Sequence, residues 1–311
     1  MVDLVGIIFT GFTIFMWATA SLVYKAGLEK TQPKANLFFR LCLVSIGTFV
    51  FSSIFGNYSF LTVLDSSELL GYLILCAISG FSVTFGDLLY YKALTKIEAS
   101  RAYPIVQLSL IFVYPLSFFF FGEELHLSIL IGGFLFLISV FILSKRDNSE
   151  EPKPNKTIRE RFSENLVIGI FLATGTAFFW AIAIVSFNQA RIITDDVFVT
   201  NFFRVILATS LISIVGIFQS EYYSGFKIEN RKNLKYFFYI GIAGILSLGF
   251  ADTLFYKAAE INGLVLTTTL TVNTPMVQQI LSIIFLKEKF RPRFLIAVSL
   301  IVLGNYLILF F

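Results

Sequence analysis

The chain has 311 residues, of which 57% are hydrophobic and 14% are charged, and its formal net charge is +4. A mean hydropathy of +0.81 excludes a soluble globule, because the polar residues are too few to cover its surface. Basic residues in membrane proteins mark topology, so this charge predicts no nucleic-acid partner. Cys42 and Cys76 lie within apolar runs and His126 is the single histidine, so we expect no disulfide framework, metal site or cofactor.

Apolar runs recur along the chain, each close to the roughly 20 residues that a helix needs to cross a bilayer. Lipid offers the backbone no hydrogen-bond partners, so each run must be helical. We therefore predict an all-α polytopic membrane protein with ten transmembrane helices, at residues 4–25, 37–56, 69–91, 102–121, 127–144, 166–187, 198–218, 236–256, 264–286 and 294–311.

The longest polar stretch, 145–165, is rich in charged side chains and contains Pro152 and Pro154. Such a segment cannot stay in lipid, so we interpret it as a linker between two units of five helices, residues 1–144 and 166–311.

The two units repeat each other in sequence. Since five helices are an odd number, the second copy must enter the membrane from the opposite side, which predicts inverted repeats as in many secondary transporters. The matched positions include Trp17 and Trp180, Arg40 and Arg204, Asp87 and Asp252, and Glu123 and Glu288. We interpret the two glutamates as structural, because each precedes a helix N-terminus, which favours a carboxylate.

The basic residues of the loops lie mostly on the side of the linker, in the segments around Lys30, Lys96, Lys153, Lys232 and Lys289. The positive-inside rule then places the linker in the cytoplasm and both termini outside, in a multi-pass protein of the cell membrane.

Charged residues inside the spans are costly unless they are paired. Asp87 and Arg40 both fall near the predicted cytoplasmic boundary, and their matches Asp252 and Arg204 near the outer one, so we predict one ion pair at each end. The pairs are either gates that latch the two ends of a pathway or permanent clips between helices. Lys92 and Lys257, one turn further on, can extend to the headgroups or compete for these carboxylates.

Two spans carry more polar residues than a lipid-facing helix would, 264–286 and its counterpart 102–121. We expect them to hold a substrate between the two ion pairs, with backbone carbonyls freed by Pro275, or else to hydrogen-bond neighbouring helices. The candidate cavity residues are Trp17, Tyr103, Gln107, Trp180, Asn188, Thr269, Asn273 and Gln278.

The sequence resembles the ten-helix EamA-type members of the drug/metabolite transporter superfamily along nearly its whole length. This resemblance implies transport of amino acids, other metabolites, nucleotide sugars or drugs through a central cavity. The family has a proline before its acidic turn. Pro275 matches it in the second half, whereas the first half has Leu110 at the matching position. The motifs are Trp17-Ala18, Phe39-Arg40, Tyr91-Lys92-Ala93-Leu94, Ala99-Ser100-Arg101-Ala102, Phe121-Gly122-Glu123 and Ile131-Gly132, then Trp180-Ala181, Phe203-Arg204, Tyr256-Lys257-Ala258, Pro275 and Leu303-Gly304.

We therefore expect a transporter and not an enzyme, since no nucleophile has a base at a recognisable spacing. The expected substrate is a small metabolite such as an amino acid, exported or exchanged by alternating access in a monomer or homodimer, and protons are a candidate coupling ion. The alternatives are a flippase for lipids or lipid-linked sugars, which needs a side opening, and a scaffold or sensor, which predicts a dry core.

Overall fold

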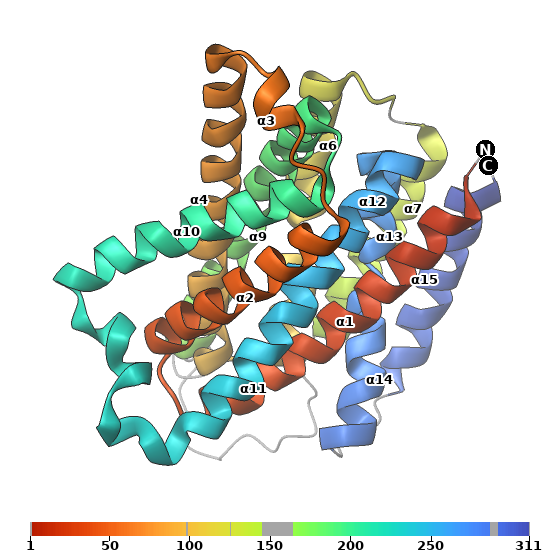
Figure 1. Ribbon diagram of the computed structural model, residues 1–311. Coiled ribbons are helices and arrows are strands. Elements are labelled where there is room, and N and C mark those ends of the chain that lie inside the picture. The colour runs from red at the N-terminus through yellow and green to blue at the C-terminus, as the bar shows by residue number, and fades with distance from the viewer. Residues whose placement is uncertain (1, 98, 125, 145–163, 287–291, 311) are drawn as a thin grey trace, which may run out of the picture.

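The computed structural model describes residues 2–97, 99–124, 126–144, 164–286 and 292–310, and all regular structure within them is helical. The predicted linker lies almost wholly outside the described residues, as does Glu288. Figure 1 shows the helices as one bundle in which segments from both halves of the chain interleave.

The first repeat contains five long helical segments and one short turn. These are α1 (Leu4–Leu28), α2 (Pro33–Phe55), α3 (Phe60–Val63), α4 (Ser66–Lys96), α5 (Ala99–Val106) with α6 (Ser109–Phe121), and α7 (Leu127–Ser144). The second contains α9 (Glu164–Thr194), α10 (Val197–Phe218), the short 3₁₀ helices η1 (Ser220–Phe226) and η2 (Ile228–Asn233), α11 (Leu234–Gly244), η3 (Ile245–Ala251), α12 (Asp252–Asn262), α13 (Leu264–Thr271), α14 (Thr274–Leu286) and α15 (Arg293–Phe310).

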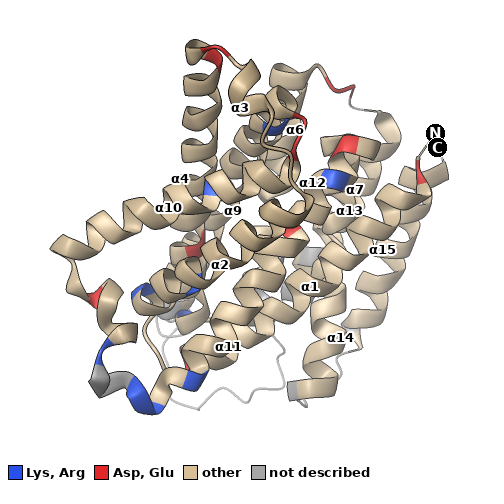
Figure 2. Ribbon diagram, viewed as in Figure 1, with Lys and Arg blue, Asp and Glu red and all other residues tan. Residues whose placement is uncertain are grey.

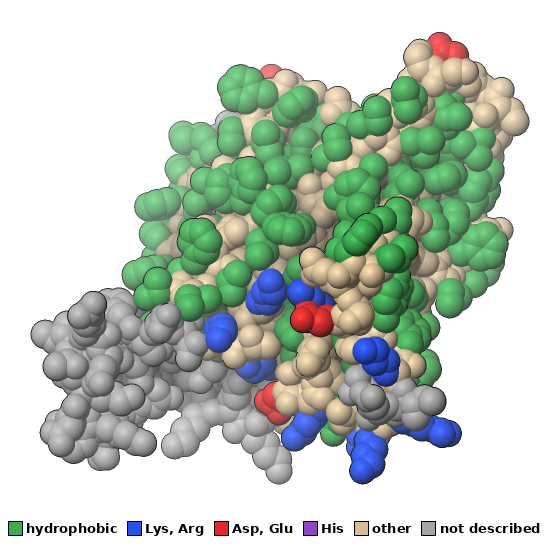
Figure 3. Space-filling model, turned by 90° about the vertical axis from the view of Figure 1, so that its left-hand side faces the viewer, with side chains coloured by type: hydrophobic (Ala, Val, Ile, Leu, Met, Phe, Trp, Pro, Cys, Tyr) green, Lys and Arg blue, Asp and Glu red, His purple; other side chains and the backbone are tan. Residues whose placement is uncertain are grey.

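The surface of the bundle is apolar. Six helices are long and apolar enough to cross a membrane by length and composition, and three shorter apolar helices accompany them in the described part of the chain. Phe119, Phe171 and Phe218 are more than three-quarters exposed, which suits lipid and not water. In Figure 3 hydrophobic side chains cover most of the visible face, and basic side chains gather at its lower end. The chain is therefore a multi-pass membrane protein.

Three spans that the sequence predicts as single helices are interrupted. Span 102–121 breaks between α5 and α6, and span 264–286 breaks between α13 and α14. The second break has a simple cause: Pro275 has no N–H to donate, so it is tolerated only in the first turn of a new helix, where it lies here. Span 236–256 contains the π-helical segment η3, which ends directly before Asp252. The ten predicted spans did not include these interruptions, although the sequence did predict that Pro275 frees backbone carbonyls in span 264–286.

The repeats pack against each other rather than side by side as separate bundles. Helix α4 of the first repeat runs along α9 of the second, while α1 runs along α11, η3 and α12. Helices α2 and α10 form another cross-repeat pair, and so do α7 and α15. Gly86 permits the close approach of α4 and α9, because a Cβ there would lie 2.6 Å from the ring of Trp180.

The two ends of the bundle differ in charge. Lys and Arg gather at the lower end in Figure 2, around η2 and the start of α11. The first and last described residues lie near the opposite end, where Val2 and Leu309 pack against the same hydrophobic cluster.

Candidate functional site

A cavity lies in the middle of the bundle, between the two repeats. It offers about 100 Å³ to water, well above the roughly 10–15 Å³ that a single water molecule needs. Most of its wall consists of matched positions from the two repeats, so the cavity lies where the repeats meet. The matched pairs are Trp17 and Trp180, Ala20 and Ala183, Ser21 and Ile184, Arg40 and Arg204, Val83 and Leu248, Asp87 and Asp252, Tyr90 and Phe255, and Tyr103 and Thr268.

The carboxylate of Asp87 has partners from both repeats. Arg40 Nη2 on α2 donates to its Oδ2, and Trp180 Nε1 on α9 donates to its Oδ1 at 3.0 Å. The Arg40 guanidinium lies over the rings of Tyr24 and Tyr91, 5.4 and 5.3 Å from their centroids. Asp87 and Arg40 are 5% and 2% exposed, so the charged groups are held by each other and by aromatic faces rather than by bulk water.

The second repeat builds the same arrangement. Arg204 Nη2 donates to Asp252 Oδ2 at 2.6 Å, and Trp17 Nε1 donates to Asp252 Oδ1 at 2.9 Å. The guanidinium of Arg204 lies over Phe187 and Tyr256, at 4.7 and 5.8 Å. Each tryptophan therefore bonds to the aspartate of the other repeat. We call Arg40, Asp87 and Trp180 the first triad, and Arg204, Asp252 and Trp17 the second triad.

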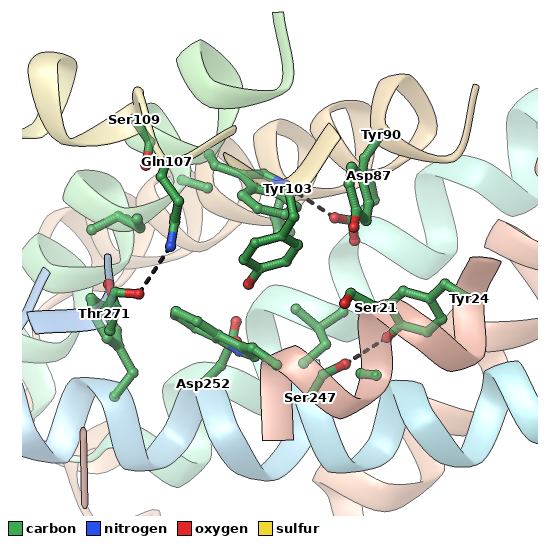
Figure 4. Close-up of a pocket in the computed structure, with 18 of the residues that line it drawn as sticks. Ser21, Tyr24, Asp87, Tyr90, Tyr103, Gln107, Ser109, Ser247, Asp252 and Thr271 are labelled. Atoms are coloured by element: carbon green, nitrogen blue, oxygen red, sulfur yellow. Dashed lines mark hydrogen bonds between the residues drawn. The ribbon is translucent and has the colours of Figure 1, made fainter. Parts of the chain in front are cut away.

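The two triads share one cavity, which corrects the expectation that they lie at opposite ends of a pathway. All six side chains line the same space. Figure 4 shows Asp87 and Asp252 on opposite sides of the cavity, with Tyr103 between them. The expectation took the depth of each aspartate in the membrane from the predicted helix ends, at residues 91 and 256. The helices are longer, because α4 extends to Lys96 and α12 to Asn262, so each aspartate lies further from its helix end.

Sequence reasoning did not single out Ser21, Tyr24, Tyr90 or Ser247, which also line the cavity. A helical spacing would have found the first three, because residues three, four and seven apart share one helix face. Ser21 and Tyr24 follow Trp17 at positions four and seven on α1, and Tyr90 follows Asp87 at position three on α4. Ser247 has no such signal, because its side chain is brought to Tyr24 Oη, at 2.5 Å, by the packing of η3 on α1.

The two helix breaks meet at the cavity. Gln107, in the break between α5 and α6, donates through Nε2 to the carbonyl oxygen of Thr271, the last residue of α13, at 2.9 Å. Both residues line the cavity, and the bond is drawn in Figure 4. The carbonyl that the break exposes at Thr271 is therefore occupied by a side chain from the other repeat. The same carbonyl also accepts from Thr274 Oγ1 at 2.5 Å, so the bond from Gln107 is its second one and ties the two broken helices together.

The π-helical segment η3 has a dedicated partner on α10. Asn201 donates through Nδ2 to the carbonyl oxygens of Leu248 and Gly249, at 3.0 and 2.9 Å, inside the π segment. The corresponding residue of the first repeat is Leu37, and α4 continues there as a regular α-helix. The wide turn therefore belongs to one repeat, and it lies one residue from Asp252, as is common for π segments near functional residues.

Four of the predicted cavity residues lie outside the cavity wall, and three of them have hydrogen bonds within the bundle. Asn188 accepts from Arg191 Nε at 2.9 Å, and Thr269 pairs with the hydroxyl of Tyr114 at 2.6 Å. Asn273 and Asn305 exchange hydrogen bonds at 3.1 and 2.9 Å. Gln278 is 2% exposed on α14. Of the predicted set, Trp17, Tyr103, Gln107 and Trp180 line the cavity.

The lysines do not compete for the cavity carboxylates. Lys257 pairs with Glu260 at 2.8 Å on the same helix, and both side chains are about one-third exposed. Lys92 is half-buried one turn beyond Asp87 and is not part of the cavity wall.

Glu123 has a structural contact with a different helix from the expected one. Its carboxylate accepts from the backbone N–H groups of Leu264 and Val265, at 3.0 and 2.8 Å, at the start of α13. It therefore caps a helix of the second repeat, where a negative charge is favoured, and not the following helix α7.

The charged side chains of the cavity are all paired. Its two arginines and two aspartates pair with each other, so their formal charges cancel. Within the described residues there is no group of three His, Cys, Asp or Glu side chains that could hold a metal ion.

A sequence model of the EamA-like transporter family matches residues 4–145 and again 167–310. The chain belongs to the EamA-like transporter family. Its two repeats are the two units that this family match marks, and they contribute one triad aspartate each. The protein is thus a member of a family of membrane transporters, in agreement with its long apolar helices.

Two further comparisons agree with this assignment. An uncharacterized transporter of Archaeoglobus fulgidus is 26% identical over 239 residues, which cover 76% of this chain and 76% of that protein. A solved crystal structure aligns with a TM-score of 0.72 over 97% of this chain and 95% of that chain, at 15% identity. The second likeness shows a shared fold.

Proposed function

We propose that this EamA-family protein is a secondary transporter that carries a small metabolite, such as an amino acid, by alternating access through the central cavity. The observation that carries the proposal is the cavity itself, which is built from matched positions of both repeats and contains both charged triads. A binding site at the interface of two repeats is the arrangement that alternating access uses, because rocking one repeat against the other opens the site to either side.

The cross-repeat bonds identify what must move. Trp180 to Asp87 and Trp17 to Asp252 each join one repeat to the other. Rocking of the repeats changes these two distances first, whereas each Arg–Asp pair lies within one repeat and moves as a unit. In this proposal the tryptophans are the gates and the Arg–Asp pairs are the rigid parts that present the carboxylates.

The volume of the cavity supports a small solute over the alternatives. A space of about 100 Å³ suits a small solute and is far too small for a lipid-linked sugar. A scaffold or sensor needs no polar cavity between its repeats, whereas ionisable residues buried inside a membrane bundle are typical of functional sites.

Two measurements test the proposal. The purified protein is screened for thermal stabilisation by small metabolites, since a ligand that binds only the folded state raises its stability. Each stabilising compound is then tested for counterflow in liposomes, against protein-free liposomes. We expect at least one compound to stabilise the protein and to exchange. Stabilisation by none, or flux equal to that of protein-free liposomes, rules the proposal out.

We further propose that the lower, basic end of the bundle faces the cytoplasm and that both termini lie outside, in the cell membrane. The support is the gathering of Lys and Arg at that end (Figures 2 and 3). Lys232→Cys on η2 and Ser59→Cys beside α3 form a matched pair at exposed positions of the two ends. In a background without the native cysteines, an impermeant thiol reagent added outside intact cells should label Ser59→Cys alone. Labelling of Lys232→Cys alone would reverse the orientation.

A further inference from the structure

The two halves of the cavity match in charge but differ in polarity at certain matched positions, while the second repeat adds the hydroxyls of Ser247, Tyr256, Thr268 and Thr271 elsewhere on the wall. At two positions where both repeats contribute to the wall, the first repeat has a hydroxyl and the second a hydrocarbon: Ser21 against Ile184, and Tyr90 against Phe255. A third difference points the same way, because Tyr24 lines the cavity and bonds to Ser247, whereas its match is an apolar phenylalanine.

The hydroxyls are also close together in space. Figure 4 shows Ser21, Tyr24 and Tyr90 on the same side of the cavity as Asp87, while Asp252 lies across from them. Tyr24 lies against the guanidinium of Arg40, and Tyr90 packs on Trp180 with ring centroids 5.6 Å apart. The opposite side has the apolar contact of Phe255 with Trp17, whose ring centroids are 5.5 Å apart.

The charges of the cavity restrict the ligand further. Each arginine is paired with an aspartate, so the formal charges of these four groups sum to zero in a largely buried site. A solute with a net charge would leave that charge uncompensated there, which is costly. A neutral or zwitterionic solute avoids the cost.

We propose that the cavity binds a small amphipathic solute of zero net charge in one orientation. Its hydrogen-bonding end lies at Ser21 and Tyr90, beside the first triad, and its apolar end lies against Ile184 and Phe255, beside the second. This inference rests on the proposed transport function and adds the class of substrate and the residues that select it. The fold is symmetric but the wall is not, so the ligand has one preferred orientation. In the reverse orientation its polar group would lie on the apolar side and lose its hydrogen bonds.

The probes for the test are L-leucine and L-asparagine, which share the same zwitterionic end and have side chains of nearly equal shape, one apolar and one polar. Equilibrium binding of each is measured on the detergent-purified full chain. The wild-type protein should bind leucine about tenfold more tightly than asparagine, because an amide against Ile184 and Phe255 loses its hydrogen bonds with water.

Two substitutions then separate the two ends. Tyr90→Phe removes the hydroxyl at the polar end, so it should weaken both probes by a similar factor, about tenfold, because both present the same zwitterion there. Ile184→Ser places at the apolar end the residue that the first repeat has, so it should lower the leucine-to-asparagine preference by about tenfold. The matched controls are Tyr72→Phe, a buried tyrosine of α4 outside the cavity, and Ile192→Ser, an exposed position of α9, and both should leave the two affinities unchanged.

The outcomes distinguish this inference from the transport function. If Tyr90→Phe alters only the preference and Ile184→Ser weakens both probes equally, the ligand lies the other way round and the inference is overturned. Equal wild-type affinities, or an unchanged preference in Ile184→Ser, also overturn it while transport stands. If neither probe binds, the inference is also overturned. The proposed transport function then fails too only if no compound of the metabolite screen binds. If Ile184→Ser does not fold, Ile184→Thr keeps the branched side chain and takes its place.

Discussion

The Arg40–Asp87 pair offers the most direct test of how the charged triads are held. Asp87→Asn keeps the size of the side chain and the oxygen that accepts from Trp180, but it removes the negative charge opposite Arg40. Arg40 is 2% exposed and cannot reach bulk water without moving. Removing one partner of such a buried pair costs about 3–5 kcal/mol.

The expected loss lies near the lower limit, about 3 kcal/mol, because two features of the site remain in the variant. The guanidinium still lies over Tyr24 and Tyr91, and the asparagine oxygen can still accept one hydrogen bond from it. Asp252→Asn should give a loss of similar size, since the second triad has the same set of partners.

The measurement is the free energy of unfolding of the purified protein in mild detergent, for wild type, Asp87→Asn and the double variant Arg40→Met with Asp87→Leu. The double variant should recover at least half of the loss, because an apolar pair leaves no unpaired charge. A loss below about 1 kcal/mol in Asp87→Asn would refute the reasoning that the pair is buried and mutually dependent. So would a double variant no more stable than the single one.

Three other predictions follow from contacts near the cavity and at a helix end. Gln107→Leu should lower the free energy of unfolding by about 0.5–1.5 kcal/mol, because the bond that joins the two broken helices is lost while the Thr271 carbonyl keeps its bond from Thr274; an unchanged denaturation midpoint would contradict it. Asn201→Leu, which copies the first repeat, should destabilise the π segment by about 1–3 kcal/mol, seen as faster amide exchange confined to η3. Asp65 caps α4, and the N–H of Glu68 holds the pKa of its carboxyl below the usual 3.8. The lowered pKa means that the Asp65 carboxylate stabilises the folded state above its unfolded pKa of 3.8, and that this stabilisation is lost as pH falls through the folded pKa. Amide exchange in the first turn of α4 should therefore speed up below pH 3.8 in the wild type. In Asp65→Ala the exchange should be fast already at neutral pH and should change less with acid, and an unchanged rate at neutral pH would contradict the prediction.

The sequence by itself was sufficient for the membrane class, the duplication and the two aspartates. These follow from local properties: apolar runs of spanning length have one backbone solution in lipid, and a duplicated unit leaves matching residues at regular intervals. The family resemblance rests on the same residues and is confirmed by the match of both halves. The neighbours Arg40 and Asp87 could be anticipated because consecutive helices of one repeat are close in space, and the structure places them in contact.

The tertiary structure alone decided what lies across the repeat interface. Trp180 bonds to Asp87 and Trp17 to Asp252, a crossing that no spacing within one repeat encodes. The same interface brings both triads into one cavity, where sequence depth had placed them at opposite ends. The break at Gln107, between α5 and α6, has Leu110 at the position that matches Pro275, so no proline at that position marks it in the sequence. Contacts across the interface join residues far apart in the chain, and helical periodicity reports which face of a helix is polar but not which helix that face meets.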